Sequence, residues 1–301
     1  MTDRLAERVA QAGRRAVDPQ VESFARDLAG QSGAAAALFY GSNLRTGSLE
    51  GVLDFYLLHE GPPRERIWPL VSYHEKELGD GSVLRAKAAT MSLDRFLRAA
   101  RGESRDTTIW ARFVQPSALV WTLDDTAREA VERALGEAAK TAARLAAVLG
   151  PKSGSAEDYW KALFRETYRA EFRVEAAGRE DSILQANAAH FDGLLPAAWE
   201  ADGLPFTQDG TALSPVLDTE TRRSILLWWK ARRRLGKPLN LLRLAKATTT
   251  FEGAARYATW KVERHTGVAI DVSPLAERYP LLAAPGALAR ILRARAHLRR
   301  P

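Results

Sequence analysis

Two apolar runs joined by a polar turn form the clearest feature in the first part of the hydrophobic pattern. They occupy residues 34–58, AAAALFYGSNLRTGSLEGVLDFYLL. Each run has the length and the apolar character of a buried strand, and the turn falls at Gly41-Ser42-Asn43. The second run carries one carboxylate, Asp54. The pattern therefore predicts two strands that bring a Gly-Ser turn and an acidic side chain into the same region.

Apolar and polar positions elsewhere in the first 121 residues predict alternating helices and strands. Residues 1–18 are weakly periodic and predict a helix or a loose arm. The elements expected after them are a helix over Gln20–Leu28, a short helix within residues 59–82, a strand over Val83–Thr90, a helix over Ser92–Ala100, and a strand over Thr107–Val114 that Pro116 closes. This alternation indicates an α/β or α+β lobe with a central mixed sheet, and for the whole chain we predict an α+β fold.

Helical periodicity dominates the remainder of the chain. The predicted elements are an Ala-rich helix over Asp124–Leu149, a Gly- and Ser-containing linker over Gly150–Ser155, an amphipathic helix over Ala156–Arg173, two or three further helices around a Gly- and Pro-containing stretch over Leu194–Pro215, a helix over Thr219–Leu235, and a final basic amphipathic helix over Pro285–Pro301. We therefore predict three parts: a sheet lobe over 1–121, a mainly helical lobe over 122–236, and a basic C-terminal segment over 237–301.

Composition excludes several classes of site. The chain has 301 residues and no cysteine, so disulfides and thiolate metal sites are excluded. The N-terminal residues are charged throughout, unlike a signal peptide, and no apolar run approaches the ~20 residues that a membrane-spanning helix needs. We therefore expect any contact with a membrane to be peripheral.

Charge is distributed unevenly along the chain. Residues 222–301 contain 18 Lys and Arg but 4 Asp and Glu, whereas residues 1–221 have an acidic excess. Such a split favours an anionic partner for the C-terminal part, either nucleic acid or an acidic lipid surface. A basic helical lobe that is simply solvated fits the same pattern. The final basic helix is of the kind that lies on an anionic bilayer, and it is equally compatible with docking on its own protein.

The chemistry that the chain favours is that of phosphate groups. A strand that ends in Gly-Ser leaves backbone N–H groups free to bind a phosphate, and a carboxylate on the neighbouring strand can hold a divalent metal against it. Nucleotidyltransferases activate nucleoside triphosphates in this way. The alternative is a buried strand, an ordinary turn and one exposed carboxylate. The sequence contains no P-loop or dinucleotide-binding fingerprint, and its five histidines lack metal-ligand spacing.

Four segments resemble the mitochondrial-type phosphatidate cytidylyltransferases, also called mitochondrial translocator assembly and maintenance proteins, a family with bacterial members. They are Phe39-Tyr40-Gly41-Ser42 with Leu53-Asp54-Phe55, Arg85-Ala86-Lys87 with Met91-Ser92-Leu93, Ile109 to Pro116 (IWARFVQP), and Leu244-Ala245-Lys246 through Tyr257 to Lys261. The chain departs from the family at Ala111, where a glycine is usual. The resemblance implies a nucleotidyltransferase-like lobe, a helical or winged-helix-like second lobe, CTP and Mg²⁺, and transfer of CMP to phosphatidate.

The resemblance also implies roles for individual residues. Tyr40, Gly41, Ser42 and Asn43 would bind the nucleotide, and Asp54 would ligate Mg²⁺. Lys87 and Arg112 would join Asp54 in the catalytic site by meeting the triphosphate from adjacent strands. Lys246 and Lys261 would bind the acceptor phosphate or close over the nucleotide.

Several alternatives stay open at the level of sequence. A second metal-binding carboxylate would come from Glu50 or Asp106, or one metal ion binds alone. Arg112 has a structural alternative as the ion-pair partner of Asp106 or Glu103. The acceptor could be another lipid phosphate or a sugar phosphate, and a non-catalytic protein of this fold could bind nucleic acid through its basic part. For the enzyme we expect a cytoplasmic location, peripheral on the inner leaflet.

Overall fold

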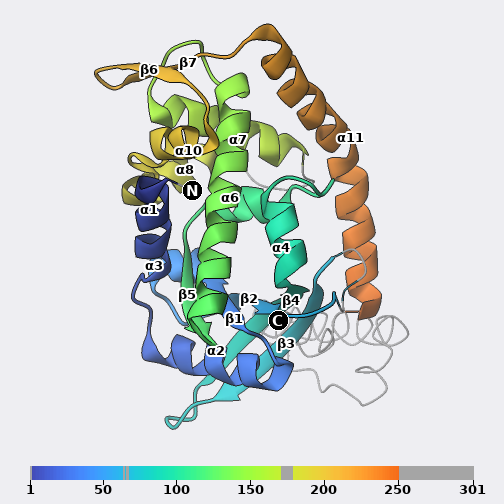
Figure 1. The fold of residues 1–301 in the computed structure, drawn as a ribbon. Coiled ribbons are helices and arrows are strands. Elements are labelled where there is room, and N and C mark those ends of the chain that lie inside the picture. Colours follow the sequence, from blue (N-terminus) through green and yellow to red (C-terminus); the bar gives the residue numbers. More distant parts are fainter. Residues whose placement is uncertain (1, 64, 66–67, 171–178, 251–301) are drawn as a thin grey trace, which may run out of the picture.

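The computed structural model describes residues 2–63, 65, 68–170 and 179–250. Within these ranges it is an α+β protein in which a five-stranded mixed sheet packs against a larger helical region (Figure 1). The helices are α1 Asp3–Gly13, α2 Pro19–Ser32, α3 Ser42–Thr46, α4 Leu93–Ala100, α5 Thr108–Phe113, α6 Asp125–Leu149, α7 Ala156–Ala170, α8 Arg179–Ala186, α9 Ala188–Phe191, α10 Leu194–Asp202 and α11 Thr219–Thr250. The strands are β1 Ala36–Tyr40, β2 Leu53–His59, β3 Leu70–Glu77, β4 Val83–Ser92, β5 Ser117–Thr122, β6 Phe206–Asp209 and β7 Ala212–Pro215.

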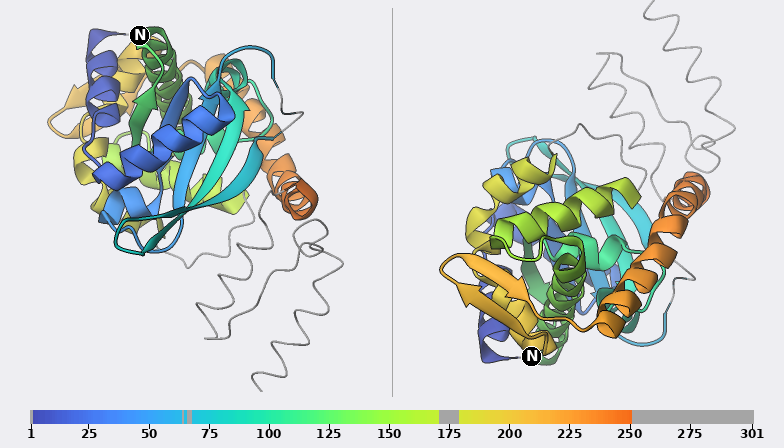
Figure 2. Two further views of the ribbon diagram at one scale, coloured as in Figure 1. Left: turned by 90° about the horizontal axis from the view of Figure 1, so that it is seen from below. Right: turned by 90° about the horizontal axis from the view of Figure 1, so that it is seen from above.

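The sheet has the strand order β3-β4-β2-β1-β5 and carries helices on both faces. Strands β2 and β4 are parallel, and the other neighbouring pairs are antiparallel. All five residues of β1 are buried because both of its faces are covered, which explains its unbroken apolar run. Ala37 and Phe39 pack with α2, which crosses the lower face of the sheet in Figure 2 (left), whereas Leu38 and Tyr40 face α4, α5 and α6.

The long helix α6 is the centre of the larger core. It has 25 residues, and alanines make up much of its buried surface, so neighbouring helices can approach it closely. Helices α1, α4, α5, α7, α10 and α11 all contact α6. One apolar cluster accordingly contains residues from both sides of position 121, including Leu38, Trp110, Leu145 and Trp199. The predicted boundaries at 121/122 and 236/237 stay predictions, and α11 runs as one helix across the second of them.

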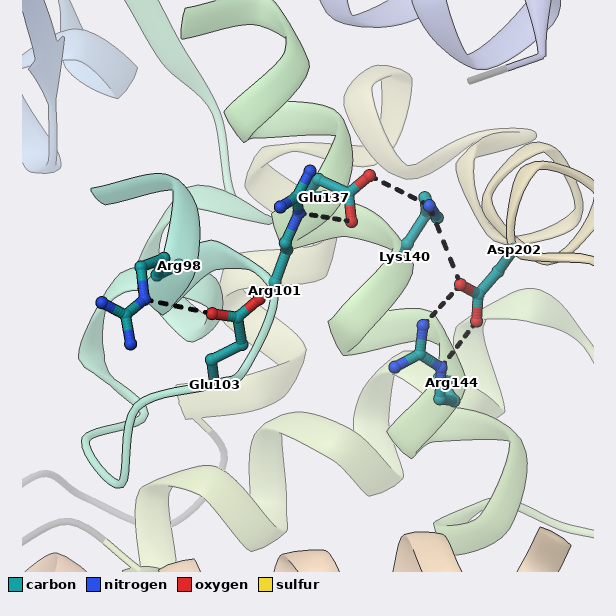
Figure 3. Close-up of polar contacts among 7 residues, drawn as sticks. All are labelled: Arg98, Arg101, Glu103, Glu137, Lys140, Arg144 and Asp202. Carbon is teal, nitrogen blue, oxygen red and sulfur yellow. Dashed lines mark hydrogen bonds and ion pairs between the residues drawn. The ribbon is translucent and has the colours of Figure 1, made fainter. Parts of the chain in front are cut away.

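Ion pairs join α6 to α4 and α10 (Figure 3). Arg144 binds Asp202 with two contacts, from Nε at 2.7 Å and from an NH group at 2.5 Å, and Lys140 lies 3.9 Å from the same carboxylate. Lys140 also contacts Glu137, whose second oxygen lies 3.7 Å from Arg101 at the end of α4. The Asp202 side chain is only 8% exposed, so this carboxylate depends on its partners for compensation of its charge.

We expect Asp202→Asn to lower the free energy of unfolding by about 2 kcal/mol, because a shielded, bidentate, charged contact is replaced by a weaker one. Denaturant unfolding followed by circular dichroism measures this. The control is Glu103→Gln, which breaks the Arg98–Glu103 pair seen in Figure 3, where the side chains are 62% and 46% exposed. It should cost less than about 1 kcal/mol. Equal losses in the two variants would contradict the importance of the shielded pair.

Three local predictions from sequence are wrong. Within residues 107–114, Thr108–Phe113 form helix α5 and not a strand, because Asp106 accepts the first helical N–H, from Thr108, at 2.7 Å. Packing of Trp110 against Trp228 and Trp229 then overrides the strand-like composition. Residues 70–77 form the edge strand β3 and not a short helix, because they pair along their length with β4. Charged side chains on this edge strand disfavour its pairing with a strand of another molecule.

The third error concerns α11, which continues past Leu235 through Gly236 and Pro238. Gly236 faces the backbone of Ala170 so closely that a Cβ atom would collide with its carbonyl. The glycine therefore lets α11 close onto α7 instead of ending the helix. The predicted basic helix over Pro285–Pro301 lies outside the described residues.

Candidate functional site

The strand register places Tyr40, Asp54 and Lys87 side by side at one end of the sheet. Tyr40 pairs with Asp54 across the antiparallel strands β1 and β2, and Asp54 pairs with Lys87 across the parallel strands β2 and β4. Directly paired residues point to the same side of a sheet, here the side that α4, α5 and α6 cover. Three residues that lie far apart in the sequence therefore converge.

Asp54 and Lys87 form an ion pair at the end of the sheet. The Asp54 Oδ1 atom is shielded from solvent, and the Lys87 ammonium lies 2.8 Å from it. The Oδ2 atom faces the turn after β1, because a Cβ atom built on Gly41 would lie 3.2 Å from it. Gly41 also has a φ of 92°, which an L-residue adopts only with strain. The glycine therefore allows the turn to pass directly over the carboxylate.

A cavity of about 340 Å³ opens beside this turn. Its volume falls within the ~300–1,000 Å³ that is typical of small-molecule sites. Tyr40, Gly41, Ser42 and Arg112, four of the residues singled out from sequence, line it. The other lining residues are Arg15, Leu44, Arg45, Gln115, Pro116, Tyr168, Ile183, Asn187, Asn240 and Arg243.

Four arginines and no carboxylate occur among the described residues that line this cavity. Arg15 and Arg45 make no ion pair within the described part of the chain, so their charges remain available to a ligand. Arg243 is oriented by two hydrogen bonds, one donated to the Thr108 hydroxyl at 2.7 Å and one to the Asn240 side-chain oxygen at 2.6 Å. Guanidinium groups bind phosphate oxygens in pairs, so the cavity is suited to a polyanion.

Arg112 reaches the cavity from α5, not from the strand that the sequence suggested. Its guanidinium lies 5.1 Å from the centre of the Tyr40 ring, within cation–π range. Burial raises the pKa of Tyr40 to about 12, and Asp54 adds to the rise while Arg112 and Arg243 oppose it. Tyr40 is therefore a neutral phenol at physiological pH, and it forms a flat wall between the sheet and the arginines.

Asn43 has a structural role in this geometry. Its side-chain amide is buried and donates to the carbonyl oxygens of Ser48 and Glu50, each at 2.8 Å. It thereby fixes the loop that leads from α3 into β2 and so sets the position of Asp54. Asn43 does not line the cavity.

No protein-family model matches the chain, and no curated protein is similar to it. Its function is therefore inferred from the residues of the site.

Asp54 and Lys87 lie behind the Gly41 turn and do not line the cavity themselves, and neither do Glu50 and Asp106, the two residues considered as a second metal ligand. Asp106 accepts hydrogen bonds from Trp68 at 2.8 Å and from the backbone N–H of Thr108 at 2.7 Å, directly before the start of α5. Glu50 is exposed. Across the described residues, no three His, Cys, Asp or Glu side chains come together as a metal-binding group.

The predicted acceptor-binding lysines are only partly covered by the structure. Lys246 lies on α11, but its side chain is outside the described set, and Lys261 lies outside the described residues. Sequence reasoning missed Arg15, Arg45 and Arg243. The only signal for Arg243 was the basic excess after residue 221.

A second cavity, of about 240 Å³, adjoins the first and shares Arg15, Gln115 and Pro116 with it. His190 lines this second cavity and donates from Nε2 to the Val114 carbonyl oxygen at 2.9 Å. Burial lowers the pKa of His190, and the nearby Arg8 and Arg15 charges lower it further.

We expect the wild-type protein to lose stability relative to His190→Gln as pH falls below the ordinary histidine pKa of 6.5. The unfolded chain then takes up a proton that the folded state resists, so the free energy of unfolding decreases with decreasing pH. Glutamine cannot titrate but keeps an amide donor for Val114. Urea unfolding of both proteins between about pH 5 and 8 tests this, a window centred on the histidine titration. A constant difference across that range would contradict it.

Proposed function

We propose that this chain is a nucleotidyltransferase that transfers CMP from CTP to phosphatidate, giving CDP-diacylglycerol and pyrophosphate. The observation that carries the proposal is the cavity lined by four arginines, which opens at the Gly41-Ser42 turn directly over Asp54. A polyanion-binding cavity beside a shielded carboxylate is the arrangement that transfer from a nucleoside triphosphate requires.

The triphosphate would lie along the turn and the arginines. Ser42 offers its N–H and hydroxyl groups, while Arg45 and Arg112 offer guanidinium groups. Lys87, paired with Asp54, would add its ammonium charge at the end of the sheet. These charges would neutralise the phosphate oxygens and hold the α-phosphorus in place for attack.

The residues present fit a Mg²⁺ ion bound through one carboxylate. Mg²⁺ in phosphate sites takes one or two carboxylates and completes its coordination with phosphate oxygens and water. The Asp54 carboxylate, with Oδ1 held by Lys87 and Oδ2 toward the turn, supplies one such ligand. When bound, the ion would add electrophilic activation of the triphosphate.

The reaction balances without a further reactant. A phosphate oxygen of phosphatidate attacks the α-phosphorus of CTP and forms the new P–O bond. The bond from the α-phosphorus to the bridging oxygen of the β-phosphate breaks, and pyrophosphate leaves with that electron pair. Arg15 and Arg243 lie on the helical side of the cavity, where they would receive the acceptor phosphate. Lys246 and Lys261 are proposed to assist there.

The proposed enzyme acts at the cytoplasmic leaflet as a peripheral protein. Within the described ranges, no helix combines the length and apolar character that crossing a bilayer requires. The acceptor is a lipid, so the protein must meet a membrane surface to reach it.

Purified full-length protein incubated with CTP, Mg²⁺ and phosphatidate tests the proposal through release of pyrophosphate. We expect turnover with CTP and little with ATP, GTP or UTP. Turnover that appears only with a sugar phosphate or another lipid phosphate would keep nucleotidyl transfer and overturn the acceptor. No turnover with any pair, together with steeply salt-dependent binding of RNA or DNA, would instead support a non-catalytic nucleic-acid-binding protein.

A further inference from the structure

The outward surface of α11 carries leucines that the rest of the described chain does not cover. Leu226, Leu227, Leu241 and Leu242 are 37%, 55%, 68% and 58% exposed, respectively. The helix lies along one side of the molecule (Figure 1). A single exposed leucine needs no explanation, but α11 carries four of the seven large apolar side chains that are exposed in the described part of the chain.

The same surface is strongly basic. Its exposed side chains include Arg222, Arg223, Lys230, Arg233, Arg234 and Lys237, of which Arg222 also donates to the Val148 carbonyl oxygen and Arg233 pairs with Glu166. The sequence contains no Asp or Glu from Thr221 to Thr250. The two leucine pairs are 15 residues apart, or about 22 Å along a helix, and most of the basic residues lie between them. We call these four leucines and six basic residues the outer face of α11.

The inner face of α11 already holds the helix on the protein. Trp229 is buried against Trp110, and Trp228 donates from its indole N–H to the Gly102 carbonyl oxygen at 3.1 Å. Arg232 donates to the carbonyl oxygens of Gly102 and Ser104, at 2.5 and 3.1 Å. The leucines on the outer face are therefore not needed to dock the helix.

We propose that the outer face of α11 is a binding surface for an anionic lipid bilayer, with the helix lying in the plane of the interface. Leucine side chains gain free energy by entering the acyl region, while the surrounding Lys and Arg stems extend their charges to the lipid phosphates. Nucleic acid would satisfy the charges but would leave the leucines in water. The combination therefore favours a membrane.

This surface also positions the cavity. Asn240 and Arg243 line the cavity from the same helix that carries Leu241 and Leu242. A bilayer bound along α11 would place this wall of the cavity close to the lipid headgroups. That last step rests on the proposed function, because only a lipid acceptor needs such access. The membrane-binding surface itself does not depend on it.

Vesicle flotation of the full-length protein tests the proposal, with vesicles of phosphatidylcholine alone or with about one-third phosphatidylglycerol, which is not the proposed acceptor. We expect binding to the anionic vesicles that weakens as salt is raised. Leu227→Ser/Leu241→Ser should lower the partition coefficient about tenfold or more, because both leucines lose their burial in the bilayer. Leu123→Ser is the matched control, since Leu123 is 62% exposed on another part of the molecule, and it should bind like the wild type.

Each of the other possible results would overturn the proposal that the outer face of α11 binds a bilayer. A wild-type protein that does not float indicates that the outer face is covered by the protein itself or left in water. A double variant that floats like the wild type places membrane binding elsewhere in the chain. If the protein does not float with vesicles but binds RNA, and the double variant still binds RNA, the basic surface binds nucleic acid instead of lipid. An assay with detergent-dispersed phosphatidate separates the proposed membrane surface from the proposed enzyme activity. If the double variant has lost only membrane binding, it should still release pyrophosphate in this assay.

Discussion

Asp54→Asn is expected to lower pyrophosphate release from CTP by about 10²–10³-fold, the loss that follows removal of one preorganised electrostatic group from an active site. Asparagine keeps the shape of the side chain but removes the charge that would bind Mg²⁺. It also removes the negative charge that pairs with the Lys87 ammonium, which lies 2.8 Å from Oδ1 in the wild-type protein. Initial rates at several Mg²⁺ concentrations measure the effect, and added Mg²⁺ should not restore the rate.

Glu50→Gln is the control for this change. Glu50 precedes the same strand, but it is exposed and is not the carboxylate that pairs with Lys87, so its variant should keep the wild-type rate. Circular dichroism should show that both variants are folded, because the Lys87 and Asp54 side chains are 37% and 26% exposed and their pair adds only modestly to stability. An Asp54→Asn protein that turns over at the wild-type rate would refute the proposed role of this carboxylate.

The sequence predicted the parts of the site that lie within one continuous segment. The apolar runs on either side of Gly41-Ser42 predicted β1 and β2 correctly, because a central strand covered on both faces is apolar throughout. The contact between Asp54 and Lys87 could not be predicted from the sequence, because it depends on the register of the parallel pair β2 and β4. A shift of one residue would have pointed Lys87 to the opposite face.

The arginine cavity shows a different limit. Arg15, Arg45 and Arg243 come from three segments with no common motif, and only packing of the helices brings them together. In a pattern of hydrophobic and polar positions, an arginine that faces solvent cannot be distinguished from an arginine that lines a binding site. Helix α5 was misread for a related reason: Thr, Ile, Trp and Phe favour strands locally, but here Asp106 and the tryptophans of α11 decide the conformation.

Gly102→Ala is expected to lower the free energy of unfolding by about 3 kcal/mol, combining left-handed backbone strain with overpacking. Gly102 has a φ of 71° at the end of α4, and a Cβ atom there would lie 2.7 Å from the Trp228 ring and 3.0 Å from Thr141. Its carbonyl oxygen also accepts hydrogen bonds from Trp228 and Arg232, so a shift of this residue disturbs the docking of α11.

Gly203→Ala separates the two causes. Gly203 ends α10 with a φ of 68°, but nothing lies within 4 Å of the position that its Cβ would take. This variant should lose only about 1 kcal/mol, from strain alone. Hydrogen exchange should show faster exchange of α11 amides in Gly102→Ala than in Gly203→Ala, because only the first change loosens that helix. Since α11 presents Arg243 to the cavity, the affinity for CTP should also fall in Gly102→Ala alone. Equal losses of stability in the two alanine variants would show that the contact between Gly102 and Trp228 does not hold α11 in place.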